Sequence, residues 1–135
     1  MKNLLLVIGF ATILSCKSTS NNYADNNNFY DKNWKLVELN HKKIVSSNRV
    51  PELIFKKDGS FTGNNGCNSI GGKFEFGEGN TIKFGAAFST KMACMNTTID
   101  RDFDKMMANT SHYKLQNDTL YLQIATKPIA KFVSK

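Results

Sequence analysis

The chain has 135 residues, of which 41% are hydrophobic and 21% are charged, and its formal net charge at pH 7 is +7. These proportions are those of an ordinary globular protein, and they exclude wholesale disorder and a collagen-like repeat, while the length provides for a single domain. The positive charge permits a nucleic-acid or anionic-membrane partner without requiring one.

The N-terminus has the pattern of an export signal. Lys2 is followed by the apolar run Leu4-Leu5-Leu6-Val7-Ile8-Gly9-Phe10-Ala11-Thr12-Ile13-Leu14. This charge and length are typical of a signal peptide, whereas a membrane span needs about 20 apolar residues. A short buried helix is the alternative. The run ends in Ile13-Leu14-Ser15-Cys16, which resembles the lipobox of bacterial lipoproteins.

This resemblance implies that residues 1–15 are a signal peptide and that Cys16 carries the acyl chains (palmitate-type lipids) of a lipoprotein. Several acyl chains anchor a protein stably to a membrane surface. Lys17 is not the Asp associated with retention in the inner membrane, so we expect a bacterial cell-envelope protein at the outer membrane, facing the periplasm. Residues 16–28 are polar and rich in Ser and Asn, which indicates a flexible tether.

Residues 29–135 are expected to form one β-rich domain. The pair Asp58-Gly59 indicates a tight turn, because Gly59 can adopt a positive φ. Polar and apolar residues alternate on both sides of residues 77–80, which indicates a hairpin. The predicted strands are Trp34–Leu39, two within 53–63, Lys73–Phe76, Thr81–Phe84, Ser111–Gln116, Thr119–Ala125 and Ile129–Val133.

One helix is predicted between Asn96 and Asn109. Ile99, Phe103, Met106 and Met107 recur at helical spacing, Thr97 or Thr98 can cap its N-terminus, and Asp100 and Asp102 lie in the first turn, where the helix dipole favours them. The expected fold class is therefore α+β, a curved antiparallel β-sheet of about seven or eight short strands with one helix.

The ordered motifs of this domain resemble those of the META domain, also called the HslJ-like family of bacterial lipoproteins. The matching residues are Trp34-Lys35-Leu36, Pro51 to Phe55, Asp58-Gly59, Phe61-Thr62-Gly63, Gly66-Cys67-Asn68-Ser69-Ile70-Gly71-Gly72, Thr90-Lys91-Met92-Ala93-Cys94, Tyr113-Lys114-Leu115 and Leu120-Tyr121-Leu122. The resemblance implies a compact β-rich fold with one helix, a link to stress responses, and no catalytic activity established for the family. The most specific element is Gly66 to Gly72, and the family-motif residues that the resemblance marks are Trp34, Gly66, Asn68, Gly71, Thr90 and Met92.

Two cysteines remain in the domain if Cys16 is lipidated. An even number of thiols in an exported domain predicts a disulfide between Cys67 and Cys94. Closing a loop of this length would stabilise the domain by about 3.5 kcal/mol in the chain-entropy model. A redox or nucleophilic cysteine is the alternative, but the chain has no Cys-x-x-Cys and only two histidines.

Other motifs that could carry chemistry have simpler structural explanations. The loop from Gly63 to Asn68 could offer amides to an anion, but we interpret it as a turn that needs positive φ, with Asn68 bonded to its own backbone. Ser89, His112 and Asp118 could be written as a hydrolase triad without any supporting elbow motif. His41 fits a polar loop.

Metal binding is not expected. Asp100, Asp102 and Asp104 recur as in a calcium loop, but the Gly and closing Glu of that loop are missing. We expect no cofactor.

The basic residues are scattered and mostly fit the solvated faces of strands. They could also contact anionic lipids or polymers. Export excludes intracellular nucleic acid as a partner. These basic residues are Lys42, Lys43, Arg49, Lys56, Lys57, Lys83, Lys91, Lys105, Lys127 and Lys131.

The sequence thus predicts a lipid-anchored envelope protein, not an enzyme, that acts as a stress-related interaction or support module with an envelope protein partner. A second hypothesis is a binding module for a lipid or small hydrophobic ligand. Phenylalanines would line its cavity at positions 74, 76, 84, 88 and 103, although core positions explain them more simply.

Overall fold

The computed structural model describes residues 28–45, 49–94 and 98–134 of the chain. Residues 1–15, Cys16 and all of the tether except Asn28 lie outside this range. The described elements are β1 (Trp34–Leu39), β2 (Lys42–Lys43), β3 (Glu52–Phe55), β4 (Ser60–Asn64), β5 (Ser69–Phe76), the 3-10 turn η2 (Glu78–Asn80), β6 (Ile82–Ser89), α1 (Ile99–Asn109), β7 (His112–Gln116), β8 (Thr119–Ile124) and β9 (Lys127–Ser134).

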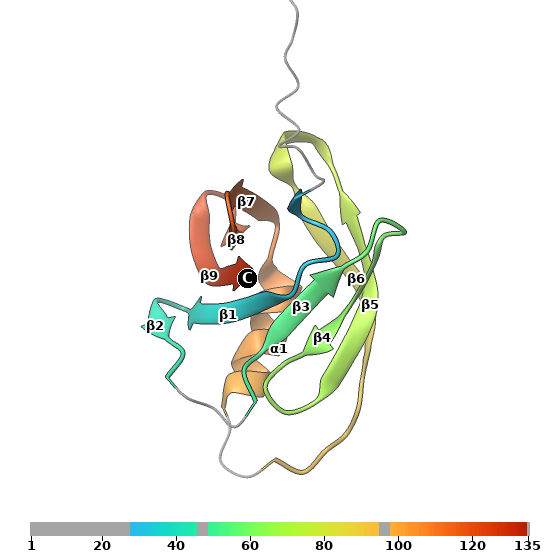
Figure 1. Cartoon of the computed structure of the whole chain (residues 1–135), viewed down its shortest axis with the longest axis vertical. Coiled ribbons are helices and arrows are strands. Elements are labelled where there is room, and N and C mark those ends of the chain that lie inside the picture. Colours follow the sequence, from blue (N-terminus) through green and yellow to red (C-terminus); the bar gives the residue numbers. More distant parts are fainter. Residues whose placement is uncertain (1–27, 46–48, 95–97, 135) are drawn as a thin grey trace, which may run out of the picture.

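The strands form one antiparallel sheet that coils around a shared interior (Figure 1). The strand order is β6-β5-β4-β3-β1-β9-β8-β7, with β2 paired to β1. The two ends of this order meet at one corner, where Thr81 bridges His112 and the Ile82 N–H donates to Ser111 O at 3.0 Å. The sheet is therefore a partly closed barrel, and the expected α+β class with one helix is confirmed for the described residues.

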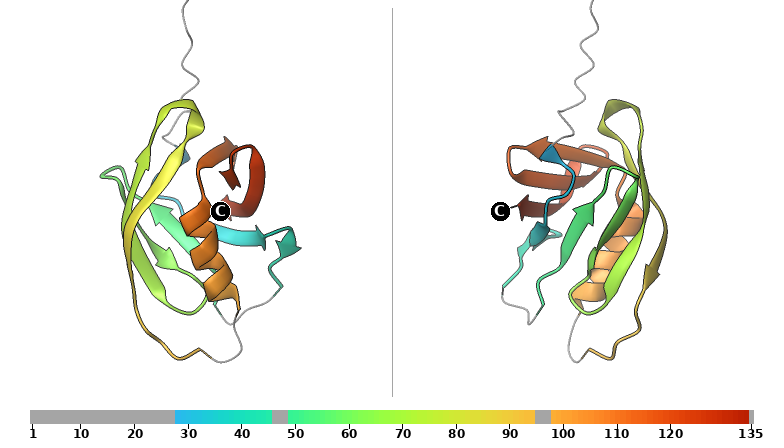
Figure 2. Two further views of the ribbon diagram at one scale, coloured as in Figure 1. Left: turned by 180° about the vertical axis from the view of Figure 1, so that it is seen from behind. Right: turned by 45° about the vertical axis from the view of Figure 1, so that its right-hand side comes forward.

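The helix α1 runs between β6 and the β7–β9 strands, on the side that the sheet leaves open (Figure 2). Its residues Phe103 and Met106 are buried, and the Phe103 ring lies 6.2 Å from that of Phe132 on β9. Thr98 occupies the N-cap position as predicted, but its side chain makes no capping hydrogen bond. The predicted alternative cap, Thr97, lies outside the described residues.

An aromatic cluster forms part of the hydrophobic core. Phe29, just before β1, stacks 4.4 Å from Phe55, and Phe55 lies 5.0 Å from Phe74. The Trp34 side chain is fully buried, and its Nε1–H donates to Phe29 O at 2.9 Å. Burying one such side chain is worth about 1.5–3 kcal/mol, so this cluster is a main source of stability. It also gives the family-motif residue Trp34 a structural role.

The structure extends two strands beyond their predicted limits. β5 begins at Ser69 and β6 continues to Ser89, although Gly71, Gly72 and the alanines that follow Gly85 have no alternating pattern. A Cβ at Gly72 would lie 2.7 Å from Ala86 O, so the missing side chain is what lets these two strands approach.

The last strand, β9, begins at Lys127, whereas the predicted strand begins at Ile129. Pro128 therefore lies inside the strand. It pairs with Gln123 next to a register shift between Leu122 and Gln123. Bulges are among the few places where a sheet tolerates proline. The short strand β2 was not predicted.

Candidate functional site

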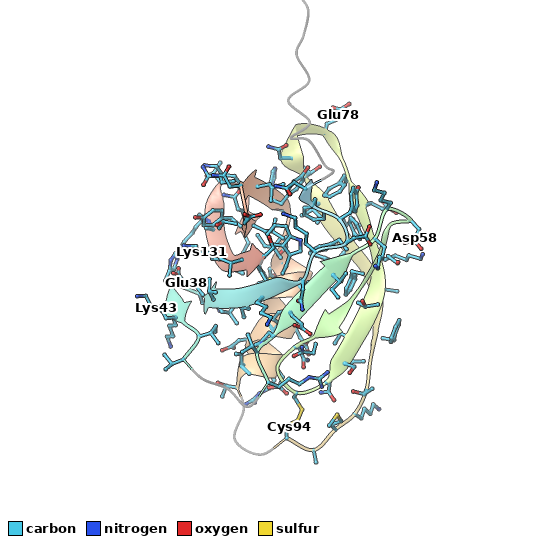
Figure 3. The ribbon with its side chains drawn as sticks, viewed as in Figure 1. Glu38, Lys43, Asp58, Glu78, Cys94 and Lys131 are labelled. Atoms are coloured by element: carbon cyan, nitrogen blue, oxygen red, sulfur yellow. A yellow bond between two sulfur atoms is a disulfide. The ribbon has the colours of Figure 1, made fainter. Side chains whose placement is uncertain are left out.

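The structure joins the two domain cysteines. Cys67, in the β4–β5 loop, is 3% exposed and forms a disulfide with Cys94, and their Cα atoms are 5.9 Å apart. The predicted bridge is therefore present, and the redox and nucleophilic alternatives have no free thiol at these positions. The bridge fixes the end of the Thr90–Cys94 segment, which leaves β6 at the lower end of the domain (Figure 3).

Asn65 organises the loop that carries Cys67. Its Oδ1 accepts hydrogen bonds from the N–H groups of Cys67 at 3.1 Å and Asn68 at 2.8 Å. Its Nδ2 donates to Asp104 on α1 at 3.0 Å. The side chain is 1% exposed, and both its oxygen and its nitrogen are hydrogen-bonded, so it links the loop to the helix. The prediction that Asn68 makes the bonds to the backbone of its own turn is wrong, because Asn65 makes them.

Asn68 bonds instead to the Thr90–Cys94 segment. Its Oδ1 accepts from the Met92 N–H at 2.7 Å and from Thr90 Oγ1 at 3.3 Å. Thr90 Oγ1 in turn accepts from the Ser69 N–H at 3.1 Å. Three family-motif residues therefore form one network beside the disulfide, and together they set the path of the segment.

Gly66 and Arg49 complete this corner. Gly66 has φ +99°, which favours glycine, and a Cβ there would come 2.8 Å from Ile99 Cγ2. The positive φ predicted for this loop is confirmed. Arg49 Nη1 donates to Cys67 O at 2.9 Å and Nη2 to Ser69 Oγ at 3.1 Å. No local pattern predicts this role of Arg49, because its partners are a backbone oxygen and a hydroxyl that are distant in the sequence.

Gly71 makes room for an aromatic ring on the outer face of the sheet. Gly71 pairs with Phe88 across β5 and β6, and a Cβ at Gly71 would overlap the Phe88 ring. The ring therefore lies over the glycine while remaining 70% exposed. Met92 is 57% exposed. These two exposed apolar side chains lie four residues apart, one on β6 and one on the segment that continues it, and we call this stretch the Phe88–Met92 surface.

The candidate triad is not assembled. His112 pairs with Thr81, just before β6, whereas Ser89 is at the far end of that strand, seven residues beyond Ile82, which corresponds to about 23 Å of strand at about 3.3 Å per residue. His112 Nδ1 lies 2.9 Å from Ser111 Oγ. The Asp118 carboxylate accepts from Lys32 Nζ at 2.8 Å, and this bond and the ammonium charge lower the pKa of Asp118.

The three aspartates of the helix do not form a cation loop. Asp100, Asp102 and Asp104 lie within α1, and Asp104 accepts a hydrogen bond from Asn65. The described ranges contain no group of three or more His, Cys, Asp or Glu side chains with metal-site geometry. His41 follows β1 in a turn with positive φ. Within residues 28–45, 49–94 and 98–134, no helix has the length and apolar character of a membrane span.

The phenylalanines named for a ligand cavity have different environments. Phe74 and Phe103 are buried, and Phe76 lies 5.3 Å from Phe74 while Phe84 lies 5.5 Å from Phe61. Phe74, Phe76, Phe84 and Phe103 therefore belong to the core or pack against it. The core interpretation is wrong for Phe88, which lies on the outer face.

These features define a small domain of one coiled antiparallel sheet and one helix, in which a disulfide joins a Gly-Cys-Asn loop to a Met-Ala-Cys segment. The chain belongs to the META domain family, whose model matches residues 27–135. No curated protein matches its sequence.

Solved structures share the fold at low sequence identity. An NMR structure from Burkholderia xenovorans has a TM-score of 0.68 at 17% identity and covers 100% of this chain and 99% of its own. A crystal structure of a DUF4847 family protein from Bacteroides vulgatus has a TM-score of 0.57 at 19% identity, covering 80% and 95%. Another NMR structure has a TM-score of 0.61 at 20% identity, covering 76% and 87%. These likenesses concern the fold.

Proposed function

We propose that this chain is an exported, lipid-anchored protein of the bacterial cell envelope, attached to the outer membrane and facing the periplasm. Two independent features support export. The apolar N-terminal run ends at Cys16 in a tetrapeptide that resembles a lipobox. Cys67 and Cys94 form a disulfide, a bond that persists in oxidising compartments. Structural disulfides are rare in cytosolic proteins.

We further propose that the META domain is a non-enzymatic interaction module that serves an envelope protein partner, in line with the stress-related role expected for the family. The Phe88–Met92 surface is the observation that carries this proposal. Exposed apolar patches commonly mark interaction sites, and both side chains belong to one exposed stretch of the chain. Here they lie on backbone that the disulfide, Asn68 and Thr90 hold in place, so binding would cost little ordering entropy.

A non-catalytic role also agrees with the hydrogen bonding of the candidate polar groups. The Asn65 side chain bonds to the loop and the helix, and Asp118 bonds to Lys32. Ser89 and His112 do not lie within hydrogen-bond reach of each other, as general-base catalysis by the candidate triad requires. The hydroxyl beside His112 is that of Ser111, which also accepts a hydrogen bond from the Ala125 N–H at 2.9 Å.

The anchor is tested by replacing its cysteine. In membrane fractions of the native bacterium, Cys16→Ser should move the protein out of the membrane fraction and remove labelling by an alkyne fatty acid. Ser15→Ala, which keeps the thiol, is the matched control and should stay membrane-bound and labelled. Membrane attachment of both variants without lipid label would contradict the proposed anchor.

The interaction surface is tested by photo-cross-linking in intact cells. A benzophenone amino acid at position 88 or 92 should give a discrete protein adduct, because these side chains would lie in the interface. The same probe at Ile124, an apolar residue that is 45% exposed at the end of β8, is the matched control. Equal adducts from all three positions, or none from 88 and 92, would contradict the proposal.

A further inference from the structure

β6 is a free edge of the sheet over its second half. The strand pairs only with β5 among the described elements, and its contact with β7 is confined to Thr81 and Ile82 at its start. From Gly85 to Ser89 every residue is exposed, on both faces of the strand. Neither the helix nor another strand therefore covers this part of the edge.

The backbone along this edge has donors that point away from the sheet. The Thr90 N–H donates to Ser69 O, toward β5, at 3.0 Å. Register is regular between the pairs Ile70–Ser89 and Gly72–Ala87. Because N–H groups alternate in direction along a strand, the amides of Ser89 and Ala87 point outward. They are available to a neighbouring extended chain.

Apart from one bulge, this edge lacks the usual protection against pairing. Native edge strands are commonly short, bulged, or carry Lys, Pro or inward-pointing charges. The register of β5 and β6 shifts between Gly72 and Phe74, which places the bulge at Gly85 and Ala86 and leaves Ala87 to Ser89 in regular register. The strand at the other end of the sheet, β7, has five residues and carries Lys114. In contrast, β6 has eight residues, and its free part reads Gly85-Ala86-Ala87-Phe88-Ser89, with no proline and no charge.

Charge around the edge is positive. Lys83 and Lys91 are exposed at its two ends, and the Lys73 Cβ would lie 3.9 Å from a Cβ at Gly85. Glu75 on β5 pairs with Lys83 of β6. Residues 82–94 themselves contain no Asp or Glu. A chain that pairs with β6 would thus meet small apolar residues in the middle and lysines at the ends.

We propose that β6 pairs with an extended segment of the partner protein, which adds a strand to the sheet along Gly85–Ser89 and places acidic residues near Lys73 and Lys91. Strand addition to an exposed edge is a general mode of peptide recognition, in which backbone hydrogen bonds supply affinity and side chains supply specificity. Phe88 and Met92 would contact the added strand from its flank. This inference rests on the proposed function, since it requires an envelope partner at the Phe88–Met92 surface.

The test blocks the edge while leaving that surface in place. Ala87→Pro removes one outward N–H without removing a bond to β5, and Ala87→Thr keeps the N–H and serves as the matched control. The readout is adduct formation from a benzophenone at position 92 of the lipidated protein in intact cells. We expect about a tenfold loss of adduct with Ala87→Pro and little change with Ala87→Thr.

A second pair of variants keeps the test informative if the proline perturbs folding. Lys73→Glu with Lys91→Glu should reduce the adduct, whereas Lys42→Glu with Lys43→Glu, which makes the same change in net charge on β2, should not. Mass spectrometry of the adduct should locate the cross-link in an extended acidic segment of the partner.

The outcomes separate the two proposals. An adduct at position 92 that survives Ala87→Pro in a folded, disulfide-bonded protein, or that responds equally to both lysine pairs, would overturn strand addition while leaving the interaction module intact. Absence of any adduct from position 92 when the rest of the sequence is unchanged would instead refute the proposed function. A cross-link to a helical or basic partner segment would also overturn strand addition.

Discussion

Asn68 accepts a hydrogen bond from the Met92 backbone N–H at 2.7 Å, across 24 residues of sequence. This bond lies beside the Cys67–Cys94 disulfide and ties the two cysteine motifs together without a covalent link. The motifs are therefore parts of one corner of the domain, and that corner sets the position of the exposed Met92 side chain.

Removing the Asn68 oxygen should loosen this corner. Asn68→Ala leaves the Met92 N–H and Thr90 Oγ1 without their acceptor, and we expect a loss of about 1 kcal/mol in the free energy of unfolding, typical for a solvent-accessible hydrogen bond. Asn68→Asp keeps the oxygen and should lose less. Urea denaturation compares the three proteins, and equal stability of the alanine and aspartate variants would refute this role.

The disulfide should be a large part of the stability of the domain. It closes a separation of 27 residues, for which the chain-entropy model gives about 3.5 kcal/mol. A reductant should therefore lower the midpoint of thermal unfolding of the wild-type domain by well over 10 °C. It should leave a Cys67→Ser, Cys94→Ser variant unchanged. A wild-type midpoint that ignores the reductant would contradict a bridge in the folded protein.

Two glycines should differ in their tolerance of a methyl group. At Gly63 a Cβ would overlap Glu52 O, a backbone atom of β3 that cannot move without breaking the strand pair, so Gly63→Ala should cost about 1–3 kcal/mol or more. At Gly71 the obstacle is the exposed Phe88 ring, which can swing outward, and Gly71→Ala should cost under about 1 kcal/mol. Chemical denaturation of both variants checks this order, and the reverse order would contradict the packing described for Phe88.

Acid should remove a stabilising contribution of Asp118. The hydrogen bond from Lys32 Nζ, and then the charge of that ammonium, lower the pKa of Asp118 in the folded state. A lowered pKa stabilises the folded protein above the unfolded-state value of about 3.9, and this stabilisation disappears as the pH falls through the folded-state pKa. Unfolding free energies of wild type and Asp118→Asn should therefore differ at pH 7 and converge below about pH 4.

Lys32→Gln provides the control for this pair. In the Asp118→Asn background it should have little further effect, because the partner charge is already absent. The difference between wild type and Asp118→Asn should also shrink in high salt, since Asp118 is largely exposed. A pH-independent difference would show that the carboxylate acts by some means other than its charge.

Much of the fold could be predicted from local patterns. Alternation located β8, the turn at Gly59 has the expected positive φ of 76°, and helical spacing located Phe103 and Met106 on the buried face of α1. Each of these signals depends on residues close in sequence. The second half of β6 escaped prediction because glycine and alanine have no hydrophobic period, and its pairing depends on the glycines of β5.

The sequence predicted the disulfide of the site but not its hydrogen bonds. Counting thiols paired Cys67 with Cys94, but the exchange of roles between Asn65 and Asn68 depends on which asparagine faces the helix. Two asparagines three positions apart in a loop offer the same side-chain chemistry, so only the fold could distinguish them. Phe88 was assigned to the core because hydrophobicity does not reveal that Gly71 lies beneath its ring on the outer face.

The most direct test of a lipid-anchored, disulfide-locked envelope protein is the intact mass of the protein extracted from membranes, measured after alkylation with and without reductant. The account predicts a chain that begins at Cys16, carries acyl groups, takes up no alkyl group without reductant and takes up two after reduction. A chain that retains Met1, lacks acyl mass and is alkylated at Cys67 and Cys94 without reductant would contradict it.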